Sequence, residues 1–245
     1  MGIFKPLPPR LQRGHPLARG LVGAWEFGEG SGTIAYDSSG YGNHGIFTAI
    51  PVPTWGGGPA GSALQFDGTG SAGGYLSVAH QYGLTNAITF VASVNFNSLT
   101  GWQDFLGQNS SNSGWSSGSL YFQKCTNGTP GAGRVANSPG IIFPTSSSDG
   151  ASGAYDPTPV VINKQYLFVA TYDGQTLRFY TNGVQAAAVS RTGNIAPQAG
   201  NLNIGAGYYL SGVVDWLSAA LSFVRIYNRA LSAAEVALLY QMTGP

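Results

Sequence analysis

Few side chains in this sequence could carry out acid–base or nucleophilic chemistry. The 245 residues include only three glutamates, Glu26, Glu29 and Glu235, and no aspartate lies within two residues of another acid. A retaining glycosidase needs two carboxylates about 5 Å apart, so here the pair would have to come from distant strands. The three histidines accompany neither a G-x-S-x-G sequence nor closely spaced zinc ligands. We therefore expect no enzymatic activity.

Aromatic side chains in loop-like stretches are better candidates for a binding site. Trp55, Trp102, Trp115 and Tyr155 lie in or beside stretches rich in Gly and Ser. Aromatic faces presented on loops can stack on sugar rings. The same side chains could instead anchor a long loop or pack between subunits, and the sequence leaves both interpretations open.

The composition favours one large β domain with many turns. Charged residues make up 9% of the chain, against about 25% in an average soluble protein. The 37 glycines and 14 prolines favour turns, and the 43% of hydrophobic residues are enough for a core. No internal repeat or linker divides the chain, so we expect a single sandwich whose surface is polar but mostly uncharged.

Two segments have the pattern of long strands. Residues 87–96 alternate apolar and polar side chains except at Val91, which predicts one face in the core and one in solvent. Residues 216–227 are apolar on both faces, as in a central strand that is covered on both sides.

A meander of three antiparallel strands is predicted next. The strands are expected at residues 166–172, 176–181 and 184–189. Asp173-Gly174 and Asn182-Gly183 separate them, and both dipeptides favour tight primed turns.

One short helix and one loop-rich region complete the layout. Ser232 and Glu235 form a capping box ahead of an apolar helical face, which predicts a helix packed on the edge of the sandwich. Residues 108–159 are dense in Gly, Ser, Thr, Asn and Pro, with brief strands expected at 120–122 and 141–143. Long loops of this kind are usually functional or bound to a partner.

The two ends of the chain carry recognisable motifs. Residues 20–45 read GLVGAWEFGEGSGTIAYDSSGYGNHG, and residues 224–240 read VRIYNRALSAAEVALLY. Between them, LQFDG, YLSV and FVATYDGQTLRFYTNG follow in order. The chain resembles laminin G-like modules of the concanavalin A-like lectin and glucanase superfamily. The resemblance implies a jelly-roll sandwich of two antiparallel sheets over residues 20–245, preceded by an extended arm over residues 1–19.

The resemblance also raises the question of calcium. In many such modules, the loop similar to residues 37–45 offers an aspartate and an asparagine to Ca²⁺, here Asp37 and Asn43. An acid near the start of the V-R-I-Y strand often completes the site, and Ser222 and Phe223 stand there instead. We therefore expect no bound cofactor, with Asp37 and Asn43 making Asx turns in a Gly-rich loop, although calcium remains an alternative.

The first residues are basic and rich in proline. Lys5, Arg10, Arg13 and Arg19 are the only charged residues before Trp25, and four bases are too few for a nucleic-acid stripe. The prolines favour an extended arm that loses little entropy on docking. These four bases are our candidates for contacting a partner, and a solvated tail is the alternative. Neither a secretion signal nor a membrane-spanning run is evident.

The arm and the sequence LARGLVGAW also resemble laminin G-like virion proteins of tailed bacteriophages. This resemblance implies a non-enzymatic protein on the virion surface, decorating the capsid through its arm as a homo-oligomer. Capsid or other virion proteins would be its partners, and it could adhere weakly to a host glycan. The first alternative is a carbohydrate-binding receptor module of a tail or fibre. The second is an enzyme that cleaves polysaccharide.

Overall fold

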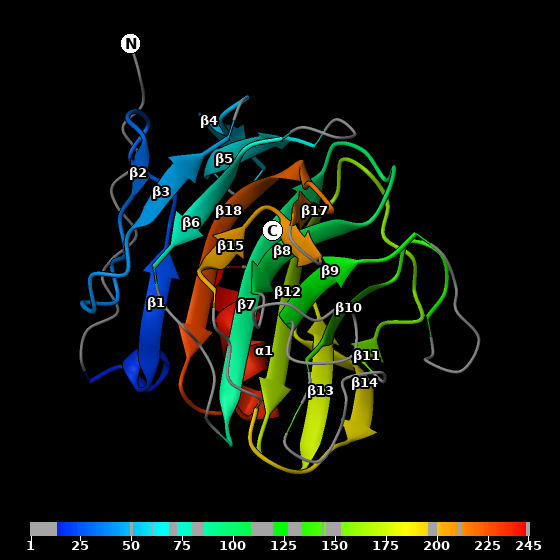
Figure 1. The fold of residues 1–245 in the computed structure, drawn as a ribbon. Helices are drawn as coiled ribbons and strands as arrows, with labels where there is room; N and C mark the ends of the chain where they lie inside the picture. Colours follow the sequence, from blue (N-terminus) through cyan, green and yellow to red (C-terminus); the bar gives the residue numbers. More distant parts are fainter. Residues whose placement is uncertain are drawn as a thin grey trace.

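The computed structural model describes residues 14–49, 51–59, 61–68, 73–79, 86–108, 120–126, 134–143, 145, 153–195, 200–209 and 212–243. Two large antiparallel sheets lie face to face (Figure 1). Apolar side chains from both sheets form one continuous core between them, as the packing of two sheets requires. The all-β jelly-roll sandwich expected from the sequence is confirmed.

The first sheet has the order β14-β13-β12-β7-β18-β5-β4, and β1 also pairs with β18. Its strands are β1 (Leu21–Trp25), β4 (Thr54–Gly58), β5 (Gly61–Asp67), β7 (Ile88–Phe96), β12 (Gln165–Tyr172), β13 (Thr176–Thr181), β14 (Val184–Ser190) and β18 (Ser218–Tyr227). The central strand predicted at residues 216–227 is confirmed as β18, which lies between β7 and β5 and is buried along nearly its whole length.

The second sheet has the order β11-β10-β9-β8-β15-β6-β3-β2. Its strands are β2 (Ile34–Ala35), β3 (Gly45–Thr48), β6 (Tyr75–Val78), β8 (Gln103–Gln108), β9 (Leu120–Lys124), β10 (Pro139–Ile142), β11 (Ala154–Tyr155) and β15 (Leu202–Ile204). A hairpin of β16 (Gly207–Tyr209) and β17 (Gly212–Val214) is tied to this sheet, because the Tyr121 hydroxyl donates to the Tyr208 carbonyl at 2.6 Å. The brief strands expected in the loop-rich region correspond to β9 and β10.

The strand β7 corrects one expectation. Its apolar positions, such as Phe90 and Phe96, point into the core between the sheets. The other face was expected to meet solvent, yet Thr89, Val91 and Ser93 are also buried. Val91 therefore follows the pattern of a strand covered on both sides.

The cover on that other face is a second apolar cluster, which we call the outer core. Residues from four strands of the first sheet meet the helix α1 (Ala233–Thr243) and the N-terminal segment there: Leu17, Val91, Leu167, Val169, Tyr180, Phe223, Tyr227, Leu231, Val236 and Leu239. The predicted capping box is confirmed, with the Ser232 N–H donating to Glu235 at 2.8 Å and the Glu235 N–H donating to Ser232 at 3.3 Å. The helix packs on the face of the sheet, not only at its edge as expected. No helix among the described residues is long and apolar enough to cross a membrane.

The meander of β12, β13 and β14 is confirmed, but one of its turns differs from expectation. Asn182 and Gly183 both have positive φ, 52° and 81°, as the tight primed turn requires. Three residues separate β12 from β13, and only Gly174 has positive φ there. The Asp173 carboxylate accepts the N–H groups of Gln175 and Thr176 at 3.0 and 2.7 Å, so its side chain closes the longer turn.

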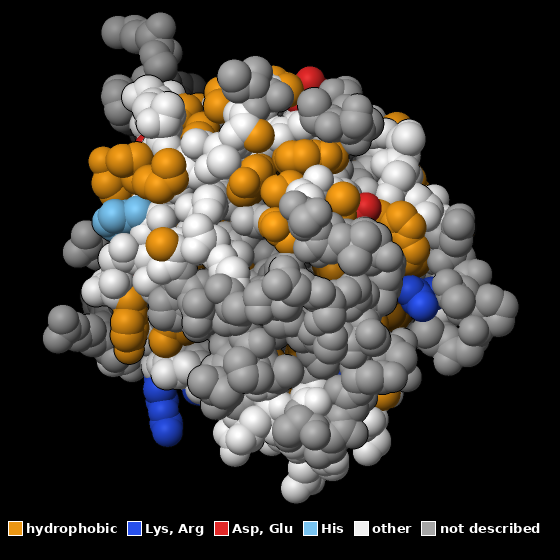
Figure 2. All heavy atoms as spheres, viewed as in Figure 1, with side chains coloured by type: hydrophobic (Ala, Val, Ile, Leu, Met, Phe, Trp, Pro, Cys, Tyr) orange, Lys and Arg blue, Asp and Glu red, His pale blue; other side chains and the backbone are white. Residues whose placement is uncertain are grey.

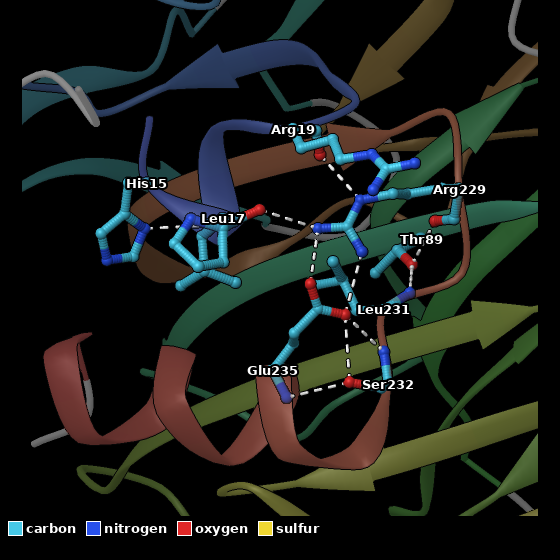
Figure 3. A network of polar contacts seen from close by, with 9 residues as sticks. His15, Leu17, Arg19, Thr89, Arg229, Leu231, Ser232 and Glu235 are labelled. Carbon is cyan, nitrogen blue, oxygen red and sulfur yellow. Dashed lines mark hydrogen bonds and ion pairs between the residues drawn. The ribbon is translucent and has the colours of Figure 1, made fainter. Parts of the chain in front are cut away.

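The last six residues of the predicted arm, residues 14–19, lie against the outer core (Figure 3). They were expected to be extended, but Pro16–Ala18 form a turn of 3₁₀ helix whose Leu17 is fully buried. Arg229 donates to the carbonyls of Arg19 and Pro16 at 2.7 and 3.0 Å and pairs with Glu235 at 2.8 Å. The segment is thus held both by apolar packing and by one arginine.

Candidate functional site

Four residues on neighbouring strands form a row across the outer face of the second sheet. Asp104 on β8 is paired with Gln123 on β9, Gln123 with Gly140 on β10, and Gly140 with Tyr155 on β11. Their neighbours Phe105 and Phe122 belong to the core between the sheets, so the row faces away from that core. We call these four residues the polar row.

Tyr155, one of the predicted binding residues, forms one end of the polar row. It is 3% exposed, and its hydroxyl accepts a hydrogen bond from the Gln123 amide at 2.9 Å. A Cβ atom at Gly140 would lie 2.2 Å from the Tyr155 ring, so only glycine leaves room for the ring over β10. Burial raises the pKa of Tyr155 to about 12, and the phenol stays protonated at neutral pH.

Asp104 forms the other end of the row, and its carboxyl group is buried. The side chain is 0% exposed, and neither oxygen has a hydrogen-bond partner among the residues that the structure describes. Its backbone N–H donates to the Asp215 carbonyl at 2.9 Å. Burial, and then the nearby Asp215, raise the pKa of Asp104 well above its usual range. The carboxyl group of Asp104 therefore holds its proton more tightly than an exposed aspartate, and its protonated form can both donate and accept hydrogen bonds.

Asp215 and Lys124 carry the charges beside Asp104. Burial raises the pKa of Asp215 to about 6, which the charge of Lys124 partly opposes. Lys124 is buried and donates to the carbonyls of Leu99 and Gly101, at 2.8 and 2.5 Å. Burial lowers its pKa to about 8. At neutral pH the two side chains bear opposite charges.

Trp102 and Arg134 form a partly exposed rim beside the polar row. The central carbon of the Arg134 guanidinium lies 5.9 Å from the centre of the Trp102 ring and 5.1 Å from that of Tyr155. These distances fall within the range of cation–π attraction. The structure thus brings together two of the four predicted aromatic residues, around an arginine that the sequence analysis did not single out.

Two other predicted residues are described, and neither belongs to the rim. Trp55 on β4 donates its indole N–H to the Gly32 carbonyl at 2.8 Å and packs on Phe47, so it anchors a loop. Of the predicted partner-binding residues, Arg19 has an exposed side chain at the end of the N-terminal segment. Four predicted residues fall outside the described part of the chain: Lys5, Arg10, Arg13 and Trp115.

The loop considered for calcium uses its acid internally. Asp37 accepts the N–H groups of Ala24 and Ser39 on one oxygen, and the Asn43 N–H and Ser39 hydroxyl on the other, at 2.7 to 2.9 Å. The bond to the Ser39 N–H is an Asx turn. Asn43 donates to the Val22 carbonyl at 3.0 Å. The carboxylate of Asp37 therefore already accepts four hydrogen bonds that hold this loop to β1.

All three glutamates have structural contacts. Glu26 forms a two-point ion pair with the buried Arg225 at 2.7 and 3.0 Å, and Glu29 accepts the Tyr36 N–H at 2.6 Å. Glu235 caps α1, and its bonds to Arg229 and Ser232 lower its pKa to about 2. The acids that do come together are Asp104 and Asp215, which the sequence analysis missed because they are far apart in the chain.

Figure 2 views the molecule from the side of the second sheet. The described side chains visible there are mostly apolar or uncharged. A separate pocket of ≈ 460 Å³ lies between the segment before β12 and the start of β14, lined by Lys164, Tyr166 and Val184 among others. None of the predicted site residues lines it.

Comparison with known proteins identifies the family. Residues 67–237 match the family described as the concanavalin A-like lectin/glucanases superfamily, and the chain belongs to it. No curated protein sequence matches the chain significantly.

Solved structures share the fold at low sequence identity. Domain 4 of AbnA, a GH43 extracellular arabinanase from Geobacillus stearothermophilus solved with arabinotriose, has a TM-score of 0.65 at 15% identity, covering 90% of this chain and 98% of that one. The botulinum neurotoxin serotype G binding domain has a TM-score of 0.62 at 13% identity, covering 91% and 51%. Trypanosoma rangeli sialidase in complex with sialic acid has a TM-score of 0.59 at 19% identity, covering 90% and 32%. The chain thus spans about half of that toxin domain and a third of the sialidase.

Proposed function

We propose that this chain is a non-catalytic, lectin-like module that binds carbohydrate on the outer face of its second sheet. The observation that carries the proposal is the partly exposed rim of Trp102 and Arg134 beside the polar row. A sugar offers an apolar ring face and several hydroxyl groups. An aromatic ring with polar groups next to it matches both.

The contacts of the acids support binding over hydrolysis. Glu26, Glu29 and Glu235 are held by bonds within the protein. The Asp104 carboxyl group is fully buried, and a catalytic acid must reach the glycosidic oxygen. Arabinotriose and sialic acid in the names of structural neighbours are consistent with a saccharide ligand.

Two tryptophan variants test the proposal. We expect Trp102→Ala to weaken binding to a responsive glycan about tenfold, the loss of roughly 1.4 kcal/mol. Trp55→Ala serves as the matched control, because Trp55 packs on Phe47 away from the rim. A glycan array followed by calorimetry measures both. Equal losses in the two variants, or none in Trp102→Ala, would contradict the assignment of the site.

We further propose that the module decorates the surface of a bacteriophage virion, with the basic N-terminal arm docked on capsid or other virion proteins. The support is the arm itself, with Lys5, Arg10, Arg13 and Arg19 preceding the domain motif. A receptor module on a tail or fibre is the alternative.

Deletion of residues 1–13 tests this placement, because it removes three of the four bases and keeps Leu17 in the outer core. We expect the truncated protein to fold and to lose co-sedimentation with particles. Arg178→Gln, which removes an arginine of β13, is the control for unspecific charge effects. Native occupancy by the truncated protein would rule out the arm as anchor.

A further inference from the structure

The charge of Arg134 is not neutralised by the described part of the chain. Its Nε atom is buried and has no hydrogen-bond partner in the described ranges of the chain. Three other described arginines differ, because Arg178, Arg225 and Arg229 form ion pairs with carboxylates at 2.5, 2.7 and 2.8 Å. A guanidinium group left without an acceptor while partly desolvated is costly. An anion that accepts hydrogen bonds from the guanidinium group would offset this desolvation cost.

The two rings hold this cation without using its donors. Attraction by an aromatic ring acts on the charge of the guanidinium, whereas hydrogen bonds use the N–H groups in its plane. The contacts with Trp102 and Tyr155 therefore leave the N–H groups of Arg134 without an acceptor among the described residues. A carboxylate matches the planar fork of a guanidinium group with two parallel hydrogen bonds.

The neighbouring acids leave the site with a positive charge. Burial raises the pKa of Asp104 well above its usual range, which favours its neutral form, and raises the pKa of Tyr155 to about 12, so the phenol stays neutral. Lys124 and Asp215 are coupled to each other and bear opposite charges at neutral pH. The remaining charge is that of Arg134, at the partly exposed rim.

We infer that Arg134 is the specificity residue for a sugar carboxylate, so that the module prefers acidic saccharides containing uronic or sialic acid. This inference rests on the proposed carbohydrate binding. The carboxylate accepts two N–H groups of Arg134 while the sugar ring packs against Trp102. A neutral sugar would leave the guanidinium without an acceptor.

The test compares saccharides that differ only in charge. Calorimetry with the full chain uses trigalacturonate against its methyl ester, and sialyllactose against lactose. We expect at least one acidic member to bind ten times more tightly than its neutral partner at low salt. The preference should shrink as salt is added, because the rim is partly exposed.

Variants then assign the preference to Arg134. Arg134→Gln should abolish the preference for the acidic saccharide. Arg134→Lys should retain only part of this preference, because lysine keeps the positive charge but lacks the planar guanidinium group that donates two parallel hydrogen bonds. Arg178→Gln is the control, because it removes an arginine that is already paired on the first sheet. Thermal melting confirms that each variant is folded.

The outcomes separate the two proposals. Equal binding of charged and neutral partners, or a preference that survives in Arg134→Gln, overturns the inference and leaves carbohydrate binding standing. Absence of binding to every saccharide by the folded wild-type chain overturns both.

Discussion

At the scale of single residues, the absence of a side chain at Gly140 is what allows the Tyr155 ring to lie over β10. We expect Gly140→Ala to lower the free energy of unfolding by about 1–3 kcal/mol, because the added methyl group would overlap the ring. The same substitution should also weaken glycan binding, because the Arg134 guanidinium lies against the Tyr155 ring. Chemical denaturation measures the first effect. Gly212→Ala, which meets nothing within 4 Å, should change neither property.

Asp215 gives a prediction for pH. Its pKa is raised to about 6 in the folded protein, mainly by burial, from an ordinary value of 3.8. The folded state therefore binds this proton more tightly than the unfolded chain, and Asp215 lowers stability progressively as pH rises from about 4 to about 6. Asp215→Asn removes that dependence. The unfolding free energies of both proteins are measured at pH 4 and at pH 7. The stability of the variant relative to the wild type should be higher at pH 7 than at pH 4. An equal difference at the two pH values would contradict the raised pKa.

At the scale of elements, the N-terminal segment and α1 complete the outer core together. Leu17→Ala should lower the free energy of unfolding by about 2–5 kcal/mol, as for other fully buried leucines. Deletion of residues 1–13 should have little effect on unfolding. Deletion of residues 1–19 should destabilise the domain, because it removes Leu17 and two carbonyls that bind Arg229. Urea denaturation of the three proteins compares them directly.

Elements with local signals could be predicted from the sequence. The Ser232 and Glu235 capping box and the Asn182-Gly183 turn depend on residues next to each other in the chain, and both are present in the structure. The buried outer face of β7 could not be predicted, because Val91 is covered by Leu17 and by α1, which are distant in sequence. A glycine inside a strand, such as Gly140, was the available signal that another group approaches the backbone closely.

The candidate site was less predictable than the fold for the same reason. Trp102 and Tyr155 were found from their type and their loop-like surroundings. Arg134, Asp104 and Asp215 gain their roles only when β8, β11 and the end of the β16–β17 hairpin meet. The burial and the pKa values of these residues depend on contacts between segments that are distant in sequence. No pattern within one stretch of the sequence could therefore predict them.

At the scale of the whole molecule, the one small rim found among the described residues predicts weak binding per copy. Several copies on one support should bind a glycan-coated surface at least a hundredfold more tightly, because linked sites raise the effective concentration. Biotinylated protein joined as tetramers on streptavidin, compared with the free chain by surface plasmon resonance, measures the gain. Tetramers of Trp102→Ala should lose most of it, whereas an equal gain for that variant would indicate attachment through another surface.

The outer core also determines how the molecule is oriented on a support. Residues 14–19 and α1 lie together on the outer face of the first sheet, and the polar row lies on the outer face of the second. The two faces are on opposite sides of the sandwich. A tether joined to either end of the domain therefore leaves from the side away from Trp102 and Arg134. Immobilisation through such a tether, on a sensor chip or a bead, should leave the side that carries Trp102 and Arg134 turned outward.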